Sequence, residues 1–245
     1  MVPDLKKKVF TLEEVLDKIN DGASIMFSDV HGGWAADEII DGMIAKGVKN
    51  LTAVGVASGR PDYGMGKLIT NHQVSKLLTT HIGLNKSSID QMFAGEMEVE
   101  FIPQGTFAER IRCGGFGLGG ALTRTGFGTS YAEGKDVVTV DGVDYILEKP
   151  IHCDIALLHV TKADKAGNCY CRGGSHLCVD YMAMAADLVI VEAEELVEIG
   201  ELDPEKVIIQ GPVCDMVYVR QGEKKPMWGF WQKQIDKIKA KQAAK

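Results

Sequence analysis

The sequence predicts an α/β fold: a mostly parallel sheet flanked by helices, with an inserted antiparallel hairpin. Short apolar runs alternate with amphipathic stretches along the chain, which is the pattern of strands joined by crossover helices. Two later runs, Ile155 to Val160 and Leu188 to Glu192, are almost uninterrupted in apolar residues, as expected for strands that helices cover on both faces. Asp141-Gly142 separates two β-rich runs within Val137 to Leu147, which predicts a tight hairpin.

The individual elements follow from local signals. Thr11 and Glu14 form the pattern of a capping box and an apolar stripe follows, so the first helix begins here, and Asp21-Gly22 ends it with a turn. Strands and helices are then expected to alternate, with a further helical stretch over Phe107 to Arg112. The expected strands are Ala23 to Phe27, Asn50 to Val56, Lys76 to Ile82 and Val99 to Ile102, and the helices are Asp37 to Ala45 and Gly66 to Asn71.

Length and composition are those of an ordinary globular protein. The 245 residues are 45% hydrophobic and 25% charged, and we expect a single domain over 1–245, with a core over about 10–220 and a basic C-terminal helix over about 230–243. The formal net charge of −7 gives no reason to expect nucleic acid or an anionic membrane as a partner. The chain shows neither a membrane-spanning apolar run nor a signal-peptide pattern, so we expect a cytoplasmic location.

The six cysteines do not have the spacing of a known cofactor site. Cys169, Cys171, His176 and Cys178 lie close together in the sequence, but C-x-C-x4-H-x-C is not a standard zinc spacing. In a reducing compartment the cysteines would stay as thiols. We therefore expect neither a metal nor a permanently bound cofactor.

Candidate site residues lie in the loops that follow the predicted strands, because open α/β sheets bind ligands at the carboxyl ends of their strands. The four loops are Ser28 to Trp34, Gly55 to Asp62, His81 to Asn85 and Pro103 to Thr106. Glycines in the first loop are able to bring backbone N–H groups to a phosphate or carboxylate, although a tight βα turn has the same pattern. In the fourth loop, Gln104 places an uncharged hydrogen-bond donor at a strand end, where a structural bridge is the commoner role.

The glycine-rich segment Cys113 to Gly120 contains a formal G-x-G-x-x-G, from Gly115 to Gly120. A dinucleotide fingerprint needs a strand before it and a helix after it, whereas here a predicted helix precedes the glycines. We interpret the segment as a flexible or closely packed loop over a site. The sequence has no G-x-S-x-G elbow, H-E-x-x-H pattern or P-loop, which disfavours those hydrolase and nucleotide-binding classes.

Taken in chain order, these loops and their neighbours resemble the alpha subunit of the acetate/acetoacetate (3-oxoacid) type of family I CoA-transferases. Each matching stretch is a weak signal alone, but their combination and order are specific. The stretches are Asp21 to Ala23, Leu51 to Val54, Gly95 to Val99, Pro103 to Thr106, Glu109 to Gly115, Thr125 to Thr129, Met182 to Ala186 and Val197 to Pro204.

The resemblance implies a CoA-transferase chain that works with a beta subunit, in an expected α2β2 heterotetramer. In such enzymes a glutamate carboxylate attacks the acyl-CoA thioester and CoA is held as a glutamyl thioester until a second carboxylate collects it. By the family pattern this glutamate lies on the partner subunit. Gln104 matches the family glutamine that donates a hydrogen bond to the developing oxyanion, and CoA enters as a substrate.

The resemblance also implies two sets of binding residues. The expected CoA contacts are Ser28, Asp29, Val30, His31, Gly32, Gly33 and Trp34, and the expected acyl-substrate contacts are Val56, Gly83, Asn85, Gly115 and Phe116. The chain departs from the family in the first loop, where Ser28-Asp29-Val30 replaces Gly-Gly-Phe and Asp29 introduces a negative charge. Val56 stands where asparagine is usual, which suggests a short saturated or hydroxylated acyl group rather than a 3-oxo acid.

Two other functions fit the same residues. An acyl-CoA hydrolase subunit would use water in place of the second carboxylate, and a non-catalytic acyl-CoA or ligand-binding protein would have kept only the scaffold. A requirement for an added carboxylate acceptor would separate the transferase from the hydrolase. Copurification of a glutamate-bearing beta subunit would separate both from the binding protein.

Overall fold

The computed structural model describes residues 7–29, 34–222, 239 and 242. Within them, the main sheet contains eight mutually parallel strands and one short antiparallel strand, β10 (Cys169–Tyr170), which pairs with β9. The parallel strands lie in the order β1 (Val9–Phe10), β12 (Met216–Val219), β11 (Ala186–Val197), β9 (Cys153–Asp164), β2 (Ser24–Phe27), β3 (Leu51–Val54), β4 (Val74–Thr79) and β5 (Glu98–Phe101). The predicted α/β class with a mostly parallel sheet is confirmed.

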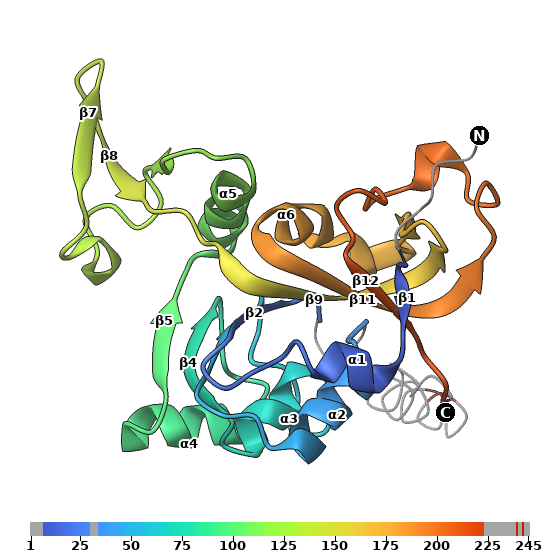
Figure 1. Ribbon diagram of the computed structural model, residues 1–245. Coiled ribbons are helices and arrows are strands. Elements are labelled where there is room, and N and C mark those ends of the chain that lie inside the picture. Colours follow the sequence, from blue (N-terminus) through green and yellow to red (C-terminus); the bar gives the residue numbers. More distant parts are fainter. Residues whose placement is uncertain (1–6, 30–33, 223–238, 240–241, 243–245) are drawn as a thin grey trace.

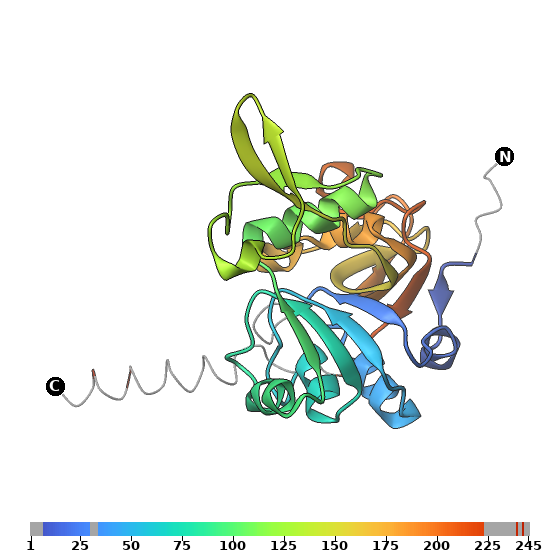
Figure 2. The same ribbon diagram turned by 90° about the vertical axis from the view of Figure 1, so that its left-hand side faces the viewer.

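Helices cover both faces of this sheet. Figure 1 shows one group below the sheet and a second group above it, and Figure 2 shows the same separation after a 90° turn. The lower group is α1 (Leu12–Leu16), α2 (Asp37–Lys46), α3 (Met65–Thr70) and α4 (Lys86–Ala94), and the upper group is α5 (Gln104–Gly115) and α6 (Val179–Met184). Burial on both faces explains why β9 and β11 are nearly continuous in apolar residues.

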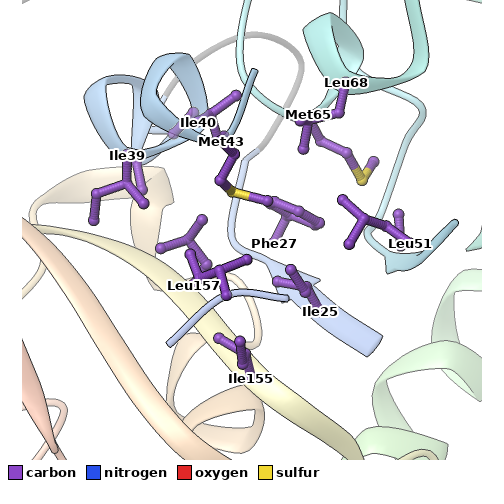
Figure 3. Packing of buried hydrophobic residues seen from close by; sticks show 14 of the residues in the cluster. Ile25, Phe27, Ile39, Ile40, Met43, Leu51, Met65, Leu68, Ile155 and Leu157 are labelled. Atoms are coloured by element: carbon purple, nitrogen blue, oxygen red, sulfur yellow. The ribbon is translucent and has the colours of Figure 1, made fainter. Parts of the chain in front are cut away.

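The alternation of side chains along β2 divides the core into two clusters. Phe27 packs with Met43 of α2 and Met65 of α3 on the lower face (Figure 3), whereas Met26 packs with Phe107 of α5 on the upper face. Successive strand residues point to opposite faces, so a four-residue strand contributes to both clusters.

Local sequence sets the start of α1 as expected, although the helix ends at Leu16, earlier than the predicted end at the Asp21-Gly22 turn. The Thr11 hydroxyl accepts a hydrogen bond from the Glu14 N–H at 3.2 Å, and the Glu14 carboxylate accepts one from the Thr11 N–H at 2.8 Å. This confirms the predicted capping box before α1. At the other end of α2, Gly47 adopts a left-handed conformation with φ of 73°, which closes the helix at low steric cost.

A second, antiparallel sheet projects from the upper left of the molecule in Figure 1. Its strands have the order β6 (Ala121–Thr123), β8 (Val143–Glu148) and β7 (Val137–Val140). Asp141 and Gly142 both have positive φ, 49° and 76°, as a tight hairpin turn requires. The predicted hairpin is confirmed, and β6 extends it to a sheet that the sequence did not indicate. Short 3-10 turns lie at Ser130–Ala132, Gly173–His176 and Pro204–Lys206.

The structure changes several predicted boundaries. β9 and β11 are both 12 residues long, α4 was not predicted, and α5 continues through Gly115. The glycine-rich segment was therefore wrongly assigned to a loop at its start: Gly114 lies in the helix, where a Cβ would come within 2.0 Å of the Ile151 carbonyl oxygen. The predicted C-terminal helix over about 230–243 falls almost entirely outside the described residues. No helix among the described residues is long and apolar enough to cross a membrane.

The order of the strands reverses between β2 and β9. From β2 the chain continues through β3, β4 and β5 toward one side, whereas from β9 it continues through β11 and β12 toward the other. Connections that leave in opposite directions open a crevice at the carboxyl ends of the two central strands. This crevice is where a ligand is expected.

Candidate active site at the carboxyl edge of the sheet

Ser28 begins the first loop, directly after β2, at the point where the strand order reverses. Its side chain is buried, and the hydroxyl oxygen accepts a hydrogen bond from the backbone N–H of His159 in β9 at 2.9 Å. The same hydroxyl donates to the carbonyl oxygen of Trp34 at 3.4 Å. Ser28 thus joins the two central strands to the far end of its own loop.

Asp29 is only 2% exposed, and its two carboxylate oxygens have different environments. Oδ2 accepts a hydrogen bond from the Met65 N–H at 3.0 Å, whereas Oδ1 has no partner. Burial raises the pKa of Asp29 to about 7, although the Met65 N–H opposes this shift. The negative charge expected from the sequence is therefore only partial at neutral pH.

The far end of the first loop is fixed by its backbone. Ala35 donates its N–H to the Tyr63 hydroxyl at 3.3 Å. Trp34 has a φ of 57°, which is uncommon for a residue with a side chain, and its ring lies against Gly174, where a Cβ would be 3.1 Å from it. The expected CoA contacts Val30, His31, Gly32 and Gly33 lie outside the described residues.

The second and third loops hold residues with structural contacts. The Val56 side chain is 4% exposed and belongs to the upper core cluster, and its carbonyl oxygen accepts two hydrogen bonds from Thr80. Asn85 is fully buried and caps α4, with Oδ1 accepting from the Ser87 N–H and Nδ2 donating to the Gly66 carbonyl oxygen. A Cβ on Gly83 would meet nothing within 4 Å.

Gln104 is the first residue of α5 and is exposed. Its side-chain amide has no hydrogen-bond partner among the described residues, so it is available to a ligand at this edge. Adjacent strands are about 4.8 Å apart, and β5 lies three positions from β2, which places Gln104 roughly 14 Å from the first loop. A ligand that touches both must be an extended molecule.

Gly115 and Phe116 lie at the other end of α5. Eleven helical steps of about 1.5 Å separate Gln104 from Gly115 by roughly 16 Å. Phe116 is 54% exposed and packs edge-on against Tyr181 of α6, beside a cavity of about 320 Å³. The expected acyl-substrate contacts are therefore not in one place: Val56, Gly83 and Asn85 follow β3 and β4, whereas Gly115 and Phe116 are near the opposite edge of the sheet.

Two buried polar pairs near the first loop were not found from the sequence. The His159 Nε2 lies 2.9 Å from a Glu194 carboxylate oxygen, and Arg220 forms an ion pair with the fully buried Glu192. The signal was available, because His159, Glu192 and Glu194 interrupt or end apolar runs in β9 and β11, and Arg220 directly follows the apolar strand β12. Sequence reasoning could not pair them, since their contacts join strands about 30 residues apart.

Cysteine and histidine do not assemble a metal site in the part of the chain that the structure describes. No group of three or more His, Cys, Asp or Glu side chains is placed to hold an ion there. Of the six free thiols, Cys113, Cys153, Cys169, Cys171 and Cys214 are buried and Cys178 is half-buried. Burial raises the pKa of the Cys153 thiol to about 12 and that of Cys178 to about 11, which suppresses their reactivity.

A parallel α/β sheet whose strand order reverses beside the buried Ser28 and Asp29, with a free amide at its carboxyl edge, is the arrangement of a ligand-binding protein of the doubly wound class. A family model described as coenzyme A transferase matches residues 9–220. The chain is 39% identical over 220 residues to the alpha subunit of the acetate CoA-transferase of Escherichia coli strain K12, covering 90% of this chain and 100% of that protein. It therefore belongs to the coenzyme A transferase family, as a chain of the alpha type.

Two further comparisons agree. Identity is 39% over 213 residues to the acetoacetyl-CoA:acetate/butyrate CoA transferase alpha subunit of Clostridium acetobutylicum, covering 87% of this chain and 98% of that one. An acyl-CoA transferase from Escherichia coli O157:H7, solved as a thioester complex with CoA, superposes with a TM-score of 0.78 at 20% identity. The match covers 90% of this chain and 49% of that chain, so this chain spans about half of the longer protein. The family and fold expected from the sequence are confirmed.

Proposed function

We propose that the chain is the alpha subunit of a cytoplasmic enzyme that moves CoA between a short-chain acyl-CoA and a carboxylate such as acetate. Butyryl-, propionyl- or acetoacetyl-CoA would be the donor. The observation that carries the proposal is the exposed, unpartnered amide of Gln104 at the carboxyl edge of the sheet, in a chain that closely resembles alpha subunits of named CoA-transferases.

The proposed mechanism is ping-pong, with the nucleophilic glutamate on the beta subunit. Its carboxylate adds to the thioester carbonyl, and the C–S bond of the tetrahedral intermediate then breaks, so that CoA leaves as a thiolate and an acyl-glutamyl anhydride remains. The thiolate then attacks the glutamyl carbonyl of the anhydride and releases the first carboxylate, which leaves a glutamyl-CoA thioester. The acceptor carboxylate takes up the CoA by the same steps in the reverse order and frees the glutamate. Gln104 would donate to the oxyanion of each tetrahedral intermediate, and Ser28, Asp29 and Trp34 would lie along the bound CoA.

The partner would complete the enzyme as an α2β2 heterotetramer. The relatives carry the names of alpha subunits, and the structurally similar transferase from Escherichia coli O157:H7 has a chain about twice as long as the matched region. Both observations support a second polypeptide that corresponds to the unmatched half of the longer transferase chain. The isolated alpha chain is then expected to be inactive.

The Gln104→Ala variant, coexpressed with the beta subunit, tests the oxyanion role. Transfer from butyryl-CoA to acetate should fall about 100- to 1,000-fold in kcat, because the donor acts mainly on the transition state. Gln104→Glu keeps the size of the side chain but removes the hydrogen-bond donor, and its kcat should fall by a similar factor. Asn20→Ala, which removes an exposed side-chain amide between α1 and β2, is the control and should leave kcat unchanged. A kcat within threefold of wild type for both Gln104 variants would reject the assignment.

The same assay separates the alternative functions. CoA release that needs no acceptor indicates a hydrolase, and acyl-CoA binding with no turnover in a stable complex indicates a binding protein. Acceptor-dependent transfer supports the transferase.

Substrate preference is a separate expectation. The Val56 side chain, just after β3, offers no hydrogen bond where a polar side chain would select a 3-oxo acid, so kcat/KM should be higher for butyryl- and propionyl-CoA than for acetoacetyl-CoA. A preference for acetoacetyl- or succinyl-CoA, measured with acetate as acceptor, would contradict this.

A further inference from the structure

A buried ion pair lies where the last strand ends. Arg220 directly follows β12, and Glu192 belongs to the neighbouring strand β11. The side chains are 6% and 0% exposed. The Arg220 Nε donates to the Glu192 Oε1 at 2.8 Å, and a second guanidinium nitrogen donates to the same oxygen. The other carboxylate oxygen, Oε2, is left for a different partner.

That partner is the first turn of α2. The Glu192 Oε2 accepts hydrogen bonds from the backbone N–H groups of Glu38 and Ile39, both at 3.0 Å. Helix N-termini leave such groups unpaired unless a side chain satisfies them, and Ala36 at the N-cap provides none. A carboxylate some 150 residues away in the sequence therefore caps this helix.

Arg220 also reaches the first loop itself. A guanidinium nitrogen donates to the Ala35 carbonyl oxygen at 3.1 Å, while the Ala35 N–H is held by Tyr63. Both backbone groups of Ala35 are thus fixed from opposite sides. The carboxylate of Glu38 accepts a further hydrogen bond from the Tyr218 hydroxyl, at 2.7 Å.

Stability alone does not explain a buried Arg–Glu pair. Taking both charges out of water costs roughly as much as their attraction returns, and apolar replacements are often neutral. The pair does fix geometry, because it holds the end of the first loop and the start of α2 in one position relative to β11 and β12. Ser28 and Asp29 fix the other end of the loop in a similar way.

We propose that Arg220 and Glu192 are positioning residues for acyl-CoA, which act by fixing the segment from Trp34 to Ile39 at the carboxyl edge. The inference rests on the proposed function, because it takes this edge as the CoA-binding surface. Neither residue would take part in the chemical steps. Their loss should weaken the binding of acyl-CoA more than it slows turnover.

The test uses the complex with the beta subunit in four variant forms: Arg220→Met, Glu192→Leu, the double variant, and Arg220→Lys. A matched control is the exposed Arg112–Glu109 pair of α5, changed to Met and Leu in the same way. We expect the single variants to raise the KM for butyryl-CoA tenfold or more with kcat within threefold, and the control variants to stay within twofold. Arg220→Lys, which cannot hold both Glu192 and Ala35, should recover only part of the affinity.

The double variant separates positioning from stability. Because it removes both buried charges, its unfolding temperature should return toward wild type while the KM stays raised, and this result supports positioning even where a single variant fails to fold. Recovery of both properties, or an unchanged KM in a folded double variant, would overturn the inference. The Kd of butyryl-CoA for the complex, measured by calorimetry, tests the same point without turnover. If the wild-type complex binds butyryl-CoA but transfers no CoA, that result counts against the proposed function and leaves the positioning inference to the Kd values.

Discussion

At the scale of single residues, Asp29 is the clearest departure from what its sequence position suggests. An aspartate in a glycine-rich loop is expected to be solvated and ionised, but here it is 2% exposed with one oxygen unpartnered. The nearby Asp37 has Lys67 as a counter-ion at 2.6 Å, whereas Asp29 receives only a backbone N–H. Burial therefore controls its protonation.

The stability of the protein should depend on pH through this residue. The pKa of Asp29 in the folded chain, about 7, lies above its ordinary value of 3.8. The unfolded chain ionises this carboxyl first, so the free energy of unfolding falls as pH rises from about 4 to about 7 and is level above that. The free energy of unfolding of Asp29→Asn, from urea titration, should exceed that of wild type by on the order of 4 kcal/mol at pH 8, and the difference should vanish as the pH falls below about 4.

The exposed Asp62 provides a control for that measurement. Its side chain is 73% exposed, so Asp62→Asn should leave the pH dependence of wild type unchanged. An Asp29→Asn variant that is less stable than wild type at pH 8 would show that the ionised carboxylate, rather than the acid, is the favoured form.

At the scale of elements, helix α5 shows how one residue type serves two purposes. Gly105 and Gly114 lie in the same helix, but only Gly114 is in close contact. A Cβ at Gly114 would meet the Ile151 carbonyl oxygen at 2.0 Å, whereas one at Gly105 would meet nothing within 4 Å. The first glycine position is open and the second is where the helix touches the chain that leads into β9.

Alanine substitutions at these two glycines should therefore have opposite effects. Gly105→Ala is expected to stabilise the chain by about 0.5–1 kcal/mol, because alanine favours the helix and restricts the unfolded state. Gly114→Ala is expected to destabilise it by about 1–3 kcal/mol or more, because the backbone carbonyl cannot move aside without displacing the start of β9. Urea unfolding of both variants measures the difference. Equal effects would mean that the contact at Gly114 relaxes freely.

The position of the antiparallel sheet depends on side-chain ion pairs as well as on its hairpin turn. Arg110 of α5 pairs with Glu100 at 2.5 Å and donates to the Lys149 carbonyl oxygen at 2.8 Å, and Lys135 pairs with the buried Glu148 at 2.8 Å. These contacts join β8 to α5 and β5. The hairpin follows from local sequence, but its attachment needs side chains from three separate segments.

At the scale of the whole molecule, the two hydrophobic clusters share the same central strands. Ile25 and Phe27 belong to the lower cluster and Met26 to the upper one. Unfolding of β2 would therefore remove packing residues from both clusters at once. The shared strand supports the single domain predicted from the sequence, which stays a prediction until unfolding is measured. The chain should unfold in one step.

Two probes of urea unfolding check this cooperativity. Far-UV circular dichroism follows the helices and strands, and alkylation counted by mass spectrometry follows the five buried thiols. Their midpoints should coincide, with at most Cys178 reacting slowly before the transition because its pKa is raised to about 11. Two separated transitions would indicate two domains that unfold independently.

Local sequence was enough to specify the fold class, the capping box at Thr11, the hairpin turn at Asp141-Gly142 and the family. These depend on patterns of short range: hydrophobic period, caps and turn residues act over a few neighbouring positions. The same patterns placed Gln104 at a strand end, since that position follows from the strand and helix on either side.

The surroundings of the first loop, in contrast, follow from three-dimensional contacts alone. The capping of α2 by Glu192, the double hold on Ala35 and the protonation of Asp29 all depend on groups that β11, β12 and α3 bring from distant parts of the chain. Hydrophobic periodicity predicts which apolar residues are buried, but it does not say which polar groups from distant segments will meet, so these pairings needed the tertiary structure.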